Sequence, residues 1–181
     1  MRVVAIVLAA GTSARLGRPK QLLPYRGETL IRHAARTAIA AGADETLVVV
    51  PPGRFAEEVE GLGVQVVENW SFHLGVSTSI RAAVVAAGHA RLLFTLCDQP
   101  LITPVHLRAL IESKEPIVAT AYGDTVGVPV IFAPRYIPEL LALDGDRGAR
   151  GIINGHRDEV ETVAFEGAAV DIDTEEDYGA L

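Results

Sequence analysis

Residues 3–20 decide the fold, and they read VVAIVLAAGTSARLGRPK. The stretch opens with six apolar residues in a row, without the polar alternation of a strand that has one solvent-facing side. A loop of small, hydroxyl-bearing and basic residues follows at once. A buried strand that runs straight into such a loop begins a βα unit of a parallel sheet, and the ligands of such sheets bind beyond the carboxyl ends of the strands.

Short apolar runs and amphipathic stretches alternate as far as residue 121. Further strands are expected at residues 46–50, 64–68, 91–96 and 116–121. Helices are expected at residues 30–41, 54–62, 77–87 and 104–113. Repeated βα units place helices on both faces of a sheet. We therefore predict an α/β fold, a three-layer α/β/α arrangement around a mostly parallel, Rossmann-like sheet.

The pattern changes after about residue 122. Residues 124–132 predict a turn and a strand that could run antiparallel to the others. Helices near residues 133–141 and 147–153 and a strand near residues 160–165 are expected to follow. No repeat, low-complexity tract or linker interrupts the chain, so we expect one domain over residues 1–181.

The composition is globular and argues against some partners. Of the 181 residues, 49% are hydrophobic and 22% are charged, and the formal net charge is −7. Broad nucleic-acid binding requires a basic surface, whereas a local cluster of arginine and lysine can still bind a small anion. The single cysteine, Cys97, permits no intrachain disulfide, and the apolar run at residues 3–8 is too short to span a membrane. We expect a cytoplasmic protein that binds neither nucleic acid nor a membrane.

The loop after the first strand suits a nucleoside triphosphate. Small residues at positions 9–11 would let a ligand approach the backbone closely, and Ser13 adds a hydroxyl. Arg15 and Lys20 can neutralise phosphate charge, and Lys20 is one of only two lysines in the chain. The glycine spacing fits neither a Walker A loop nor a dinucleotide fingerprint. A plain solvated loop is the simpler alternative.

The run from Leu8 to Lys20, continued by Gln-Leu-Leu-Pro at residues 21–24, resembles the signature loop of the molybdenum-cofactor nucleotidyltransferases and their wider NTP-transferase relatives. The cytidylyltransferase type is the nearest match, because Ala10 stands where guanylyl relatives have glycine. The resemblance implies a sheet of the nucleotide-diphospho-sugar transferase type. It also implies that this loop binds the nucleotide through Leu8, Ala9, Ala10, Gly11, Ser13, Arg15 and Lys20.

Roles within the loop follow from the same resemblance. Residues 9–11 would border the base and the ribose. Arg15 and Lys20 would bind the triphosphate and act in catalysis together with Asp98, described below.

The segment at residues 69–81 should open a helix and could bind a base. Its serines and threonine are good helix caps, and a helix N-terminus can also bind a polar or anionic group. The family carries a similar run beside the base, although Val76 replaces its usual methionine. The resemblance therefore adds Asn69 and Ser79 to the nucleotide-binding residues, with Ser79 reading the base. His73 is interpreted as a loop histidine.

A metal-binding carboxylate is expected at Asp98, which follows the carboxyl end of the apolar strand at residues 91–96. Mg²⁺ prefers oxygen ligands and usually takes one or two carboxylates together with phosphate oxygens. A simple turn cap is the alternative. The family has Gly-Asp-Gln-Pro here, and Cys97 replaces its glycine. The cofactor is expected to be Mg²⁺, with Mn²⁺ as the other candidate ion.

The second carboxylate should come from the acidic segment near the C-terminus. Alternation would place Asp171 and Asp173 on the same face of a short strand, and Thr174 would cap the last helix with Asp177 at the capping-box position. An acidic cap and solvated tail is the alternative. The resemblance assigns the second metal ligand to Asp173, and Asp171 remains the substitute.

Two motifs resemble the acceptor side of the family. They are Gly-Asp-Arg-Gly-Ala-Arg at residues 145–150 and Gly-Val-Pro-Val-Ile-Phe at residues 127–132. Arg147 and Arg150 would share one face of a helix and suit a phosphate-bearing acceptor. We expect acceptor binding by Gln99, Pro129, Arg147 and Arg150.

These motifs together imply a nucleotidyltransferase of the 2.7.7 class. It would move a nucleoside monophosphate, CMP from CTP, onto a phosphorylated acceptor such as the molybdopterin cofactor and release pyrophosphate. Residues 1–121 would bind the nucleotide, and residues 122–181 would form the acceptor side and supply the second carboxylate. A transient contact with a molybdoenzyme is also expected.

Other functions remain open at this point. The acceptor could be a sugar phosphate or another small phosphate, or the transferred group could be guanylyl. The chain could instead be a non-catalytic nucleotide-binding accessory protein, although a binder does not need Lys20, Asp98 and Asp173 together. The glycine spacing does not favour a dinucleotide-dependent oxidoreductase.

Overall fold

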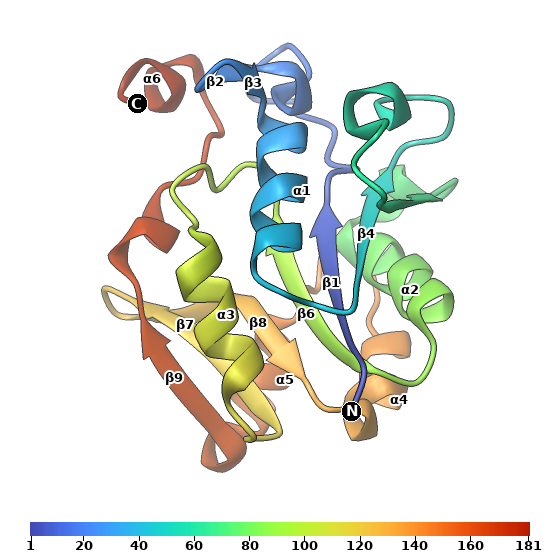
Figure 1. Ribbon diagram of the computed structural model, residues 1–181, viewed down its shortest axis with the longest axis vertical. Helices are drawn as coiled ribbons and strands as arrows, with labels where there is room; N and C mark the ends of the chain where they lie inside the picture. The colour runs from blue at the N-terminus through green and yellow to red at the C-terminus, as the bar shows by residue number, and fades with distance from the viewer.

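A seven-stranded mixed sheet forms the centre of the computed structural model, which describes residues 1–181 (Figure 1). The strand order is β5-β4-β1-β6-β8-β7-β9. The strands are β1 (Val3–Leu8), β4 (Glu45–Val50), β5 (Gln65–Glu68), β6 (Arg91–Leu96), β7 (Ile117–Tyr122), β8 (Thr125–Phe132) and β9 (Val160–Ala164). Strands β5, β4, β1 and β6 are parallel neighbours, whereas β8 runs antiparallel to both β6 and β7. The predicted α/β fold and the suggested antiparallel strand are thus confirmed.

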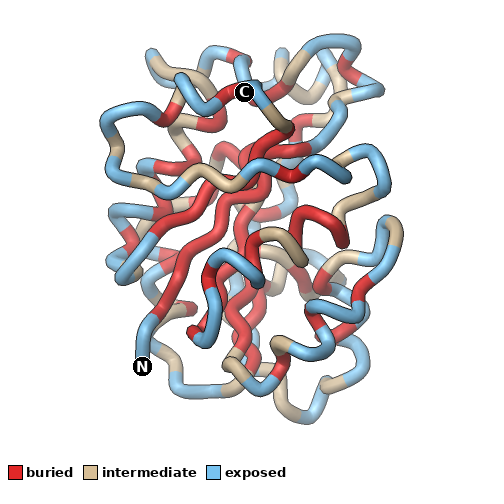
Figure 2. The backbone as a smooth tube through the Cα atoms, turned by 90° about the vertical axis from the view of Figure 1, so that its right-hand side faces the viewer, coloured by how far each residue is buried: buried red, intermediate tan, exposed pale blue.

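Helices cover both faces of this sheet, as the predicted three layers require (Figure 1). One face carries α1 (Leu30–Ala40) and α3 (Pro104–Glu112). The other face carries α2 (Val76–Ala87), α4 (Ile137–Leu141) and α5 (Arg150–Gly155). The central strands are buried along their length (Figure 2), because successive side chains enter opposite apolar cores: Ile6 packs toward α2 and Val7 toward α1.

Local sequence signals set the ends of several helices. Pro104 is the first residue of α3, and the Thr103 hydroxyl accepts the backbone N–H of His106 at 3.2 Å. Gly42 follows α1 with a φ of +89°, a left-handed conformation that glycine adopts without strain. The short C-terminal helix α6 (Glu175–Gly179) begins with the predicted capping box between Thr174 and Asp177.

The remaining elements are short. The 3-10 turns are η1 (Lys20–Leu22), η2 (Ala56–Val59), η3 (Phe72–Leu74), η4 (Pro134–Tyr136), η5 (Arg157–Glu159) and η6 (Glu166–Ala169). A small hairpin is formed by β2 (Pro24–Tyr25) and β3 (Glu28–Thr29). No helix is long and apolar enough to cross a membrane.

Three predicted elements differ in the structure. The helix expected at residues 54–62 is only the 3-10 turn η2, because the left-handed Phe55 precedes it and two left-handed glycines, Gly61 and Gly63, follow it. The helix expected at residues 147–153 begins at Arg150, so Arg147 precedes it and the two arginines share no helix face. Asp171 and Asp173 do not lie in a strand, because the segment pairs with no strand and its Ile172 N–H donates only to the carbonyl of Asp98, in the turn after β6.

The loops that carry the candidate site meet at one edge of the sheet. Strands β1, β4, β5 and β6 run in the same direction, so the segments that follow them leave at their common carboxyl ends. The C-terminal segment returns to this edge, where the Tyr178 hydroxyl donates to the Pro24 carbonyl at 2.7 Å. The topology therefore brings residues from both ends of the chain together.

Candidate functional site

A cavity of about 470 Å³ opens at this edge. Its walls come from the loop after β1, the segment before and at the start of α2, and the end of β6. Leu8, Ala10, Gly11, Lys20, Ser79 and Asp98 line it, as the sequence predicts for a nucleotide site. Thr12, whose hydroxyl the sequence offers as a donor beside that of Ser13, lines it as well. Gln21, Phe72, His73 and Asp146 also line it, although the sequence analysis assigned them no role in binding.

Lys20 lies between two carboxylates at the floor of the cavity. Its Nζ is 2.7 Å from Asp98 Oδ2 and 2.9 Å from Asp173 Oδ1. Burial disfavours the charged ammonium, but the two carboxylates outweigh this effect and hold the pKa of Lys20 above its ordinary value. Lys20 therefore keeps its positive charge at neutral pH. The tertiary structure thus joins residues that are 153 positions apart in the chain.

The same two carboxylates fit a hard divalent cation. Both contact one nitrogen, so their oxygens lie close enough together to share an ion, and Asp98 Oδ1 is buried without a hydrogen-bond partner. No cluster of three or more His, Cys, Asp or Glu side chains is present. An ion here would therefore complete its shell with water and phosphate oxygens, as Mg²⁺ does at phosphate sites.

Asp171 occupies a different position from Asp173. Partial desolvation and the nearby charges of Asp98 and Asp173 raise the pKa of Asp171 to about 6. Its carboxylate makes no ion pair with Lys20, whereas Asp173 pairs with both Lys20 and Arg15. Of the two acidic residues left open by the sequence, Asp173 is the one that the fold brings to the lysine.

Arg15 reaches the site from outside. Its guanidinium lies 2.7 Å from Asp173 Oδ2, but 73% of its side chain is exposed and it does not line the cavity. Arg15 therefore adds a positive charge at the solvent-exposed side of Asp173, the carboxylate that it shares with Lys20. Cys97 is buried, and burial raises the pKa of its thiol, so it stays an uncharged core residue.

Gln21 holds the loop after β1 in shape, a role that the sequence analysis missed. Its buried side-chain amide donates to the carbonyls of Ala9 and Gly11 at 2.9 Å each. The Ser13 hydroxyl accepts the N–H of Lys20 at 3.1 Å. Ser13 therefore stabilises the loop itself through this hydrogen bond. Ala9 contributes only its backbone carbonyl to the network, because the Ala9 side chain packs in the core under α1. In the sequence, the only sign of this role is that the residue directly after Lys20 is polar.

Replacing Gln21 with leucine is expected to destabilise the protein by about 1–3 kcal/mol, because the buried Ala9 carbonyl loses its side-chain donor. Chemical denaturation would measure the loss. The matched control is Gln65→Leu, which changes an exposed glutamine on β5. Equal stabilities of the two variants would contradict the bracing role of Gln21.

Asn69 positions Ser79 and does not line the cavity itself. Its buried amide donates to the hydroxyls of Thr78 and Ser79 at 2.8 and 2.9 Å, and its Oδ1 accepts the N–H of Ser71 at 3.0 Å. The Ser79 hydroxyl accepts one of these bonds and faces the cavity. Its own hydrogen is then available for an acceptor atom on a ligand.

A close backbone contact joins the α2 side of the cavity to the segment at residues 145–148. The Ser77 N–H donates to the Gly145 carbonyl at 3.2 Å. Gly75 has a φ of +108°, and a Cβ there would overlap the carbonyl of Gly145. Asp146, next to this contact, also lines the cavity. Only glycine fits both the conformation and the space at position 75.

Replacing Gly75 with alanine is expected to destabilise the protein by about 1–3 kcal/mol through backbone strain, with a further loss from the overlap with Gly145. The control is Gly88→Ala, which also has a positive φ but has open space for a Cβ. Thermal unfolding of both variants separates the two effects. A Gly75→Ala protein no less stable than Gly88→Ala would show that the contact is unimportant.

The expected acceptor-side residues are dispersed. Gln99 is buried and donates to the Ala168 carbonyl at 2.9 Å, and Pro129 is buried in β8. Arg150 lines a second cavity, which shares no residue with the first. Arg147 is exposed and lines neither cavity. The structure therefore does not gather these four residues into one site.

Comparison with known proteins shows which family the sequence matches. Residues 5–160 match the profile of the MobA-like NTP transferase domain. The purine catabolism protein PucB of Bacillus subtilis is 28% identical, over 97% of this chain and 94% of its own length. The nicotine blue oxidoreductase of Paenarthrobacter nicotinovorans is 33% identical, over 82% of this chain and 79% of its own. The molybdenum cofactor guanylyltransferase of Rhodobacter capsulatus is 29% identical, over 79% and 75%.

Solved structures share the whole fold. Rv0371c of Mycobacterium tuberculosis is 34% identical and superposes with a TM-score of 0.86 over 99% of this chain and 97% of its own. The same protein is also known as a complex with manganese, which superposes with a TM-score of 0.81 over 100% of this chain and 98% of its own, at 32% identity.

Proposed function

The chain belongs to the family of MobA-like NTP transferase domains, and from this premise we propose that it transfers the cytidylyl group of CTP to a phosphorylated small molecule and releases pyrophosphate. Nucleotidyl transfer is the reaction class of the family, whereas the base and the acceptor are the finer parts of the proposal. The observation that carries it is the Lys20 ammonium held between Asp98 and Asp173 at the floor of a cavity walled by a glycine-containing loop.

The acceptor in this proposal is a phosphate monoester, in line with the relative named molybdenum cofactor guanylyltransferase. A monoester oxygen is already largely anionic near neutral pH, so the attack needs no general base. Catalysis can then rest on positioning and on charge neutralisation. In the proposed step the acceptor oxygen forms a bond to the α-phosphorus of CTP, and the bond from that phosphorus to the departing pyrophosphate breaks.

The protein's contribution to this step is mainly electrostatic. Lys20 and Arg15 neutralise the charge that grows on the departing pyrophosphate. Asp98 and Asp173 would hold Mg²⁺ or Mn²⁺, and a manganese complex of the similar Rv0371c supports the choice of a divalent ion. Such an ion, when bound, shields the phosphate charges and orients their oxygens.

One feature supports CTP over GTP, and a second supports the binding of a base in general. Ala10 narrows the cavity where guanylyl relatives have glycine, which favours a smaller pyrimidine base over guanine. The Ser79 hydroxyl, oriented by Asn69, offers a hydrogen to an acceptor atom of the base. The same transfer with GTP is the nearest competing assignment, because relatives named guanylyltransferases match the chain.

The test is a pyrophosphate-release assay with the purified protein, Mg²⁺ or Mn²⁺, and each of the four ribonucleoside triphosphates. Acceptors would include molybdopterin and a panel of sugar phosphates and alcohol phosphates. Acceptor-dependent release with CTP alone is the expected result. Release with another triphosphate would keep the reaction class and overturn the assignment of the base. Triphosphate binding without release for any acceptor would favour a non-catalytic accessory protein.

A second candidate function is oxidation or reduction of a small molecule, since one similar protein is named an oxidoreductase. The cavity offers little support for it, because the loop after β1 lacks the glycine spacing of a dinucleotide site. An absorbance assay for oxidation of NADH or NADPH by quinone-type dyes tests it directly. Turnover there, with no pyrophosphate release, would replace nucleotidyl transfer by this function.

A further inference from the structure

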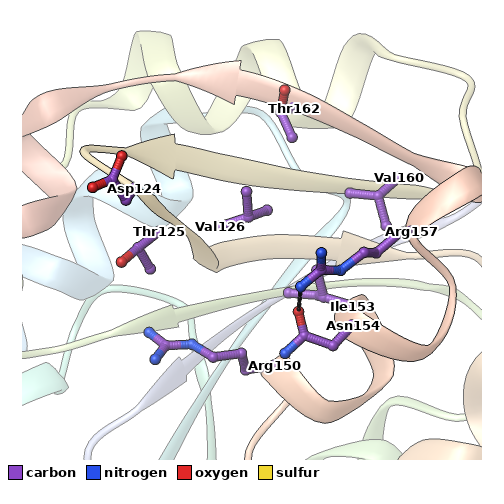
Figure 3. Close-up of a pocket in the computed structure, with 9 residues that line it drawn as sticks. All are labelled: Asp124, Thr125, Val126, Arg150, Ile153, Asn154, Arg157, Val160 and Thr162. Atoms are coloured by element: carbon purple, nitrogen blue, oxygen red, sulfur yellow. Dashed lines mark hydrogen bonds between the residues drawn. The ribbon is translucent and has the colours of Figure 1, made fainter.

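A second cavity, of about 360 Å³, lies between α5 and the strands β8 and β9 (Figure 3). It shares no lining residue with the first cavity. Arg150 enters it from α5, and Arg157 enters it from the turn that follows (Figure 3). Val126, Ile153 and Val160 supply its apolar part.

The two arginines in this cavity lack carboxylate partners. Neither forms an ion pair, and Arg157 donates only to the neutral amide oxygen of Asn154 at 3.2 Å. The other arginines, Arg147 excepted, each meet a carboxylate, a backbone carbonyl or an aromatic ring. Asp124 also lines the cavity, so its charged lining consists of two guanidinium groups and one carboxylate, and neither guanidinium is ion-paired with that carboxylate. In a chain with a net charge of −7, this local excess of positive charge can bind an anion.

The Arg150 guanidinium lies over β8 at Gly127. A Cβ built on Gly127 would be in ordinary contact with an Arg150 Nη atom at 3.6 Å and in tighter contact with the Tyr122 hydroxyl at 3.3 Å. The hydroxyls of Thr125 and Thr162 add hydrogen-bonding groups to the same cavity. Charge, hydroxyls and an apolar part together suit an amphipathic organic anion.

One short segment of chain contributes a lining residue to each of the two cavities. Asp146 lines the first cavity and Arg150 lines the second. They are four positions apart in the chain, so their Cα atoms are at most about 14 Å apart. A small molecule with its reacting phosphate at the first cavity could therefore extend past this segment into the second.

We propose that the second cavity binds the end of the acceptor that is remote from the reacting phosphate, and that this end carries a carboxylate or phosphate on an apolar body. The identity of the ligand as the acceptor rests on the proposed nucleotidyl transfer. The anion site itself does not, because it follows from Arg150, Arg157 and the apolar residues between them. The acceptor is thus a molecule with two anionic ends.

The anion site is tested by NMR titration of the ¹⁵N-labelled full-length protein with benzoate and with phenyl phosphate, and inorganic phosphate serves as the probe without an apolar body. Amide shifts at residues 124–126 and 150–160 are expected for the two aromatic anions, and the stronger ligand identifies the preferred charge. Arg157→Gln and Arg150→Gln should each weaken binding roughly tenfold. Arg36→Gln, an exposed arginine on α1 at the other face of the sheet, should leave it unchanged.

The anion site would be overturned if neither aromatic anion shifted these amides, or if only amides of the Lys20 loop shifted. It would also be overturned if the Arg150→Gln, Arg157→Gln double variant bound the anions with the parental affinity. Heat-unfolding curves of the variants would establish that they remain folded. Because the titration needs no turnover, a failure of nucleotidyl transfer leaves its result intact.

The assignment to the acceptor is tested with whichever acceptor supports pyrophosphate release. Arg157→Gln should raise the KM of that acceptor roughly tenfold, with the KM of the triphosphate unchanged. An unchanged acceptor KM, with benzoate or phenyl phosphate binding lost, would show that the cavity serves a different anion and would overturn the assignment.

Discussion

Replacing Lys20 with alanine is expected to lower the rate of nucleotidyl transfer by about 10²–10³-fold. Lys20 is the only side chain of the loop that reaches both carboxylates at the floor of the cavity, at 2.7 and 2.9 Å. Its charge would lie next to the departing pyrophosphate, and Arg15, which is exposed and contacts only Asp173, would replace it in part only. The change is measured as kcat under saturating CTP and acceptor.

The control for this variant lies in the same loop. Arg18 forms an exposed, two-point ion pair with Glu175 at 2.7 and 2.8 Å, away from the cavity. Exposed pairs of this kind contribute little, so Arg18→Ala should keep nearly normal activity. A Lys20→Ala enzyme with the same activity as Arg18→Ala would refute the catalytic role of Lys20.

Lys20→Ala should also change stability in a way that depends on divalent ions. Without the ammonium, Asp98 and Asp173 repel each other, so the variant is expected to unfold more easily at neutral pH than the parent protein. Mg²⁺ should recover more stability in the variant than in the parent, because the cation replaces the missing charge. Melting curves with and without Mg²⁺ measure both effects. An identical response to Mg²⁺ in the two proteins would argue against an ion at these carboxylates.

Replacing Asp98 with asparagine is expected to lower kcat by at least about 10²-fold and to raise the concentration of divalent ion needed for activity. Asparagine keeps the size and shape of the side chain but removes the charge that faces Lys20. It also leaves only Asp173 as a carboxylate beside the ammonium. Initial rates over a range of Mg²⁺ and Mn²⁺ concentrations measure both changes.

Glu57→Gln is the control, because it removes one negative charge at an exposed turn far from the cavity. It should leave the rate and the metal dependence unchanged. If Asp98→Asn kept the parental metal dependence while losing activity, Asp98 would act only by orienting Lys20, and the metal ligand would have to be sought elsewhere.

Much of the fold could be predicted from the sequence. The core strands are continuous runs of Val, Ile and Leu, and the start of α3 carries both Thr103 and Pro104, signals that act over a few residues. The errors occurred where distant contacts compete with local preference. The stretch around η2 has helical residues, but Phe55 packs in the core in a left-handed conformation and a regular helix does not form.

The residues of the candidate site also fall into those that the sequence predicted and those that it did not. The glycine-containing loop, Lys20 and Asp98 could be selected from the sequence, because each follows a buried strand and chemistry restricts which residues serve there. Gln21 and Asn69 could not be selected for their observed positions, because their hydrogen bonds depend on backbone and hydroxyl groups that the fold brings within reach.

The sequence by itself determined the class of fold and the family, because hydrophobic period and motif order are properties of the chain. The tertiary structure alone decided which carboxylate meets Lys20, since Asp171 and Asp173 are equivalent by spacing and differ only in where the returning segment places them. It also separated Arg147 from Arg150, because α5 begins at Arg150 and places only this arginine at the second cavity. Both outcomes depend on contacts between segments far apart in the chain, which no local pattern encodes.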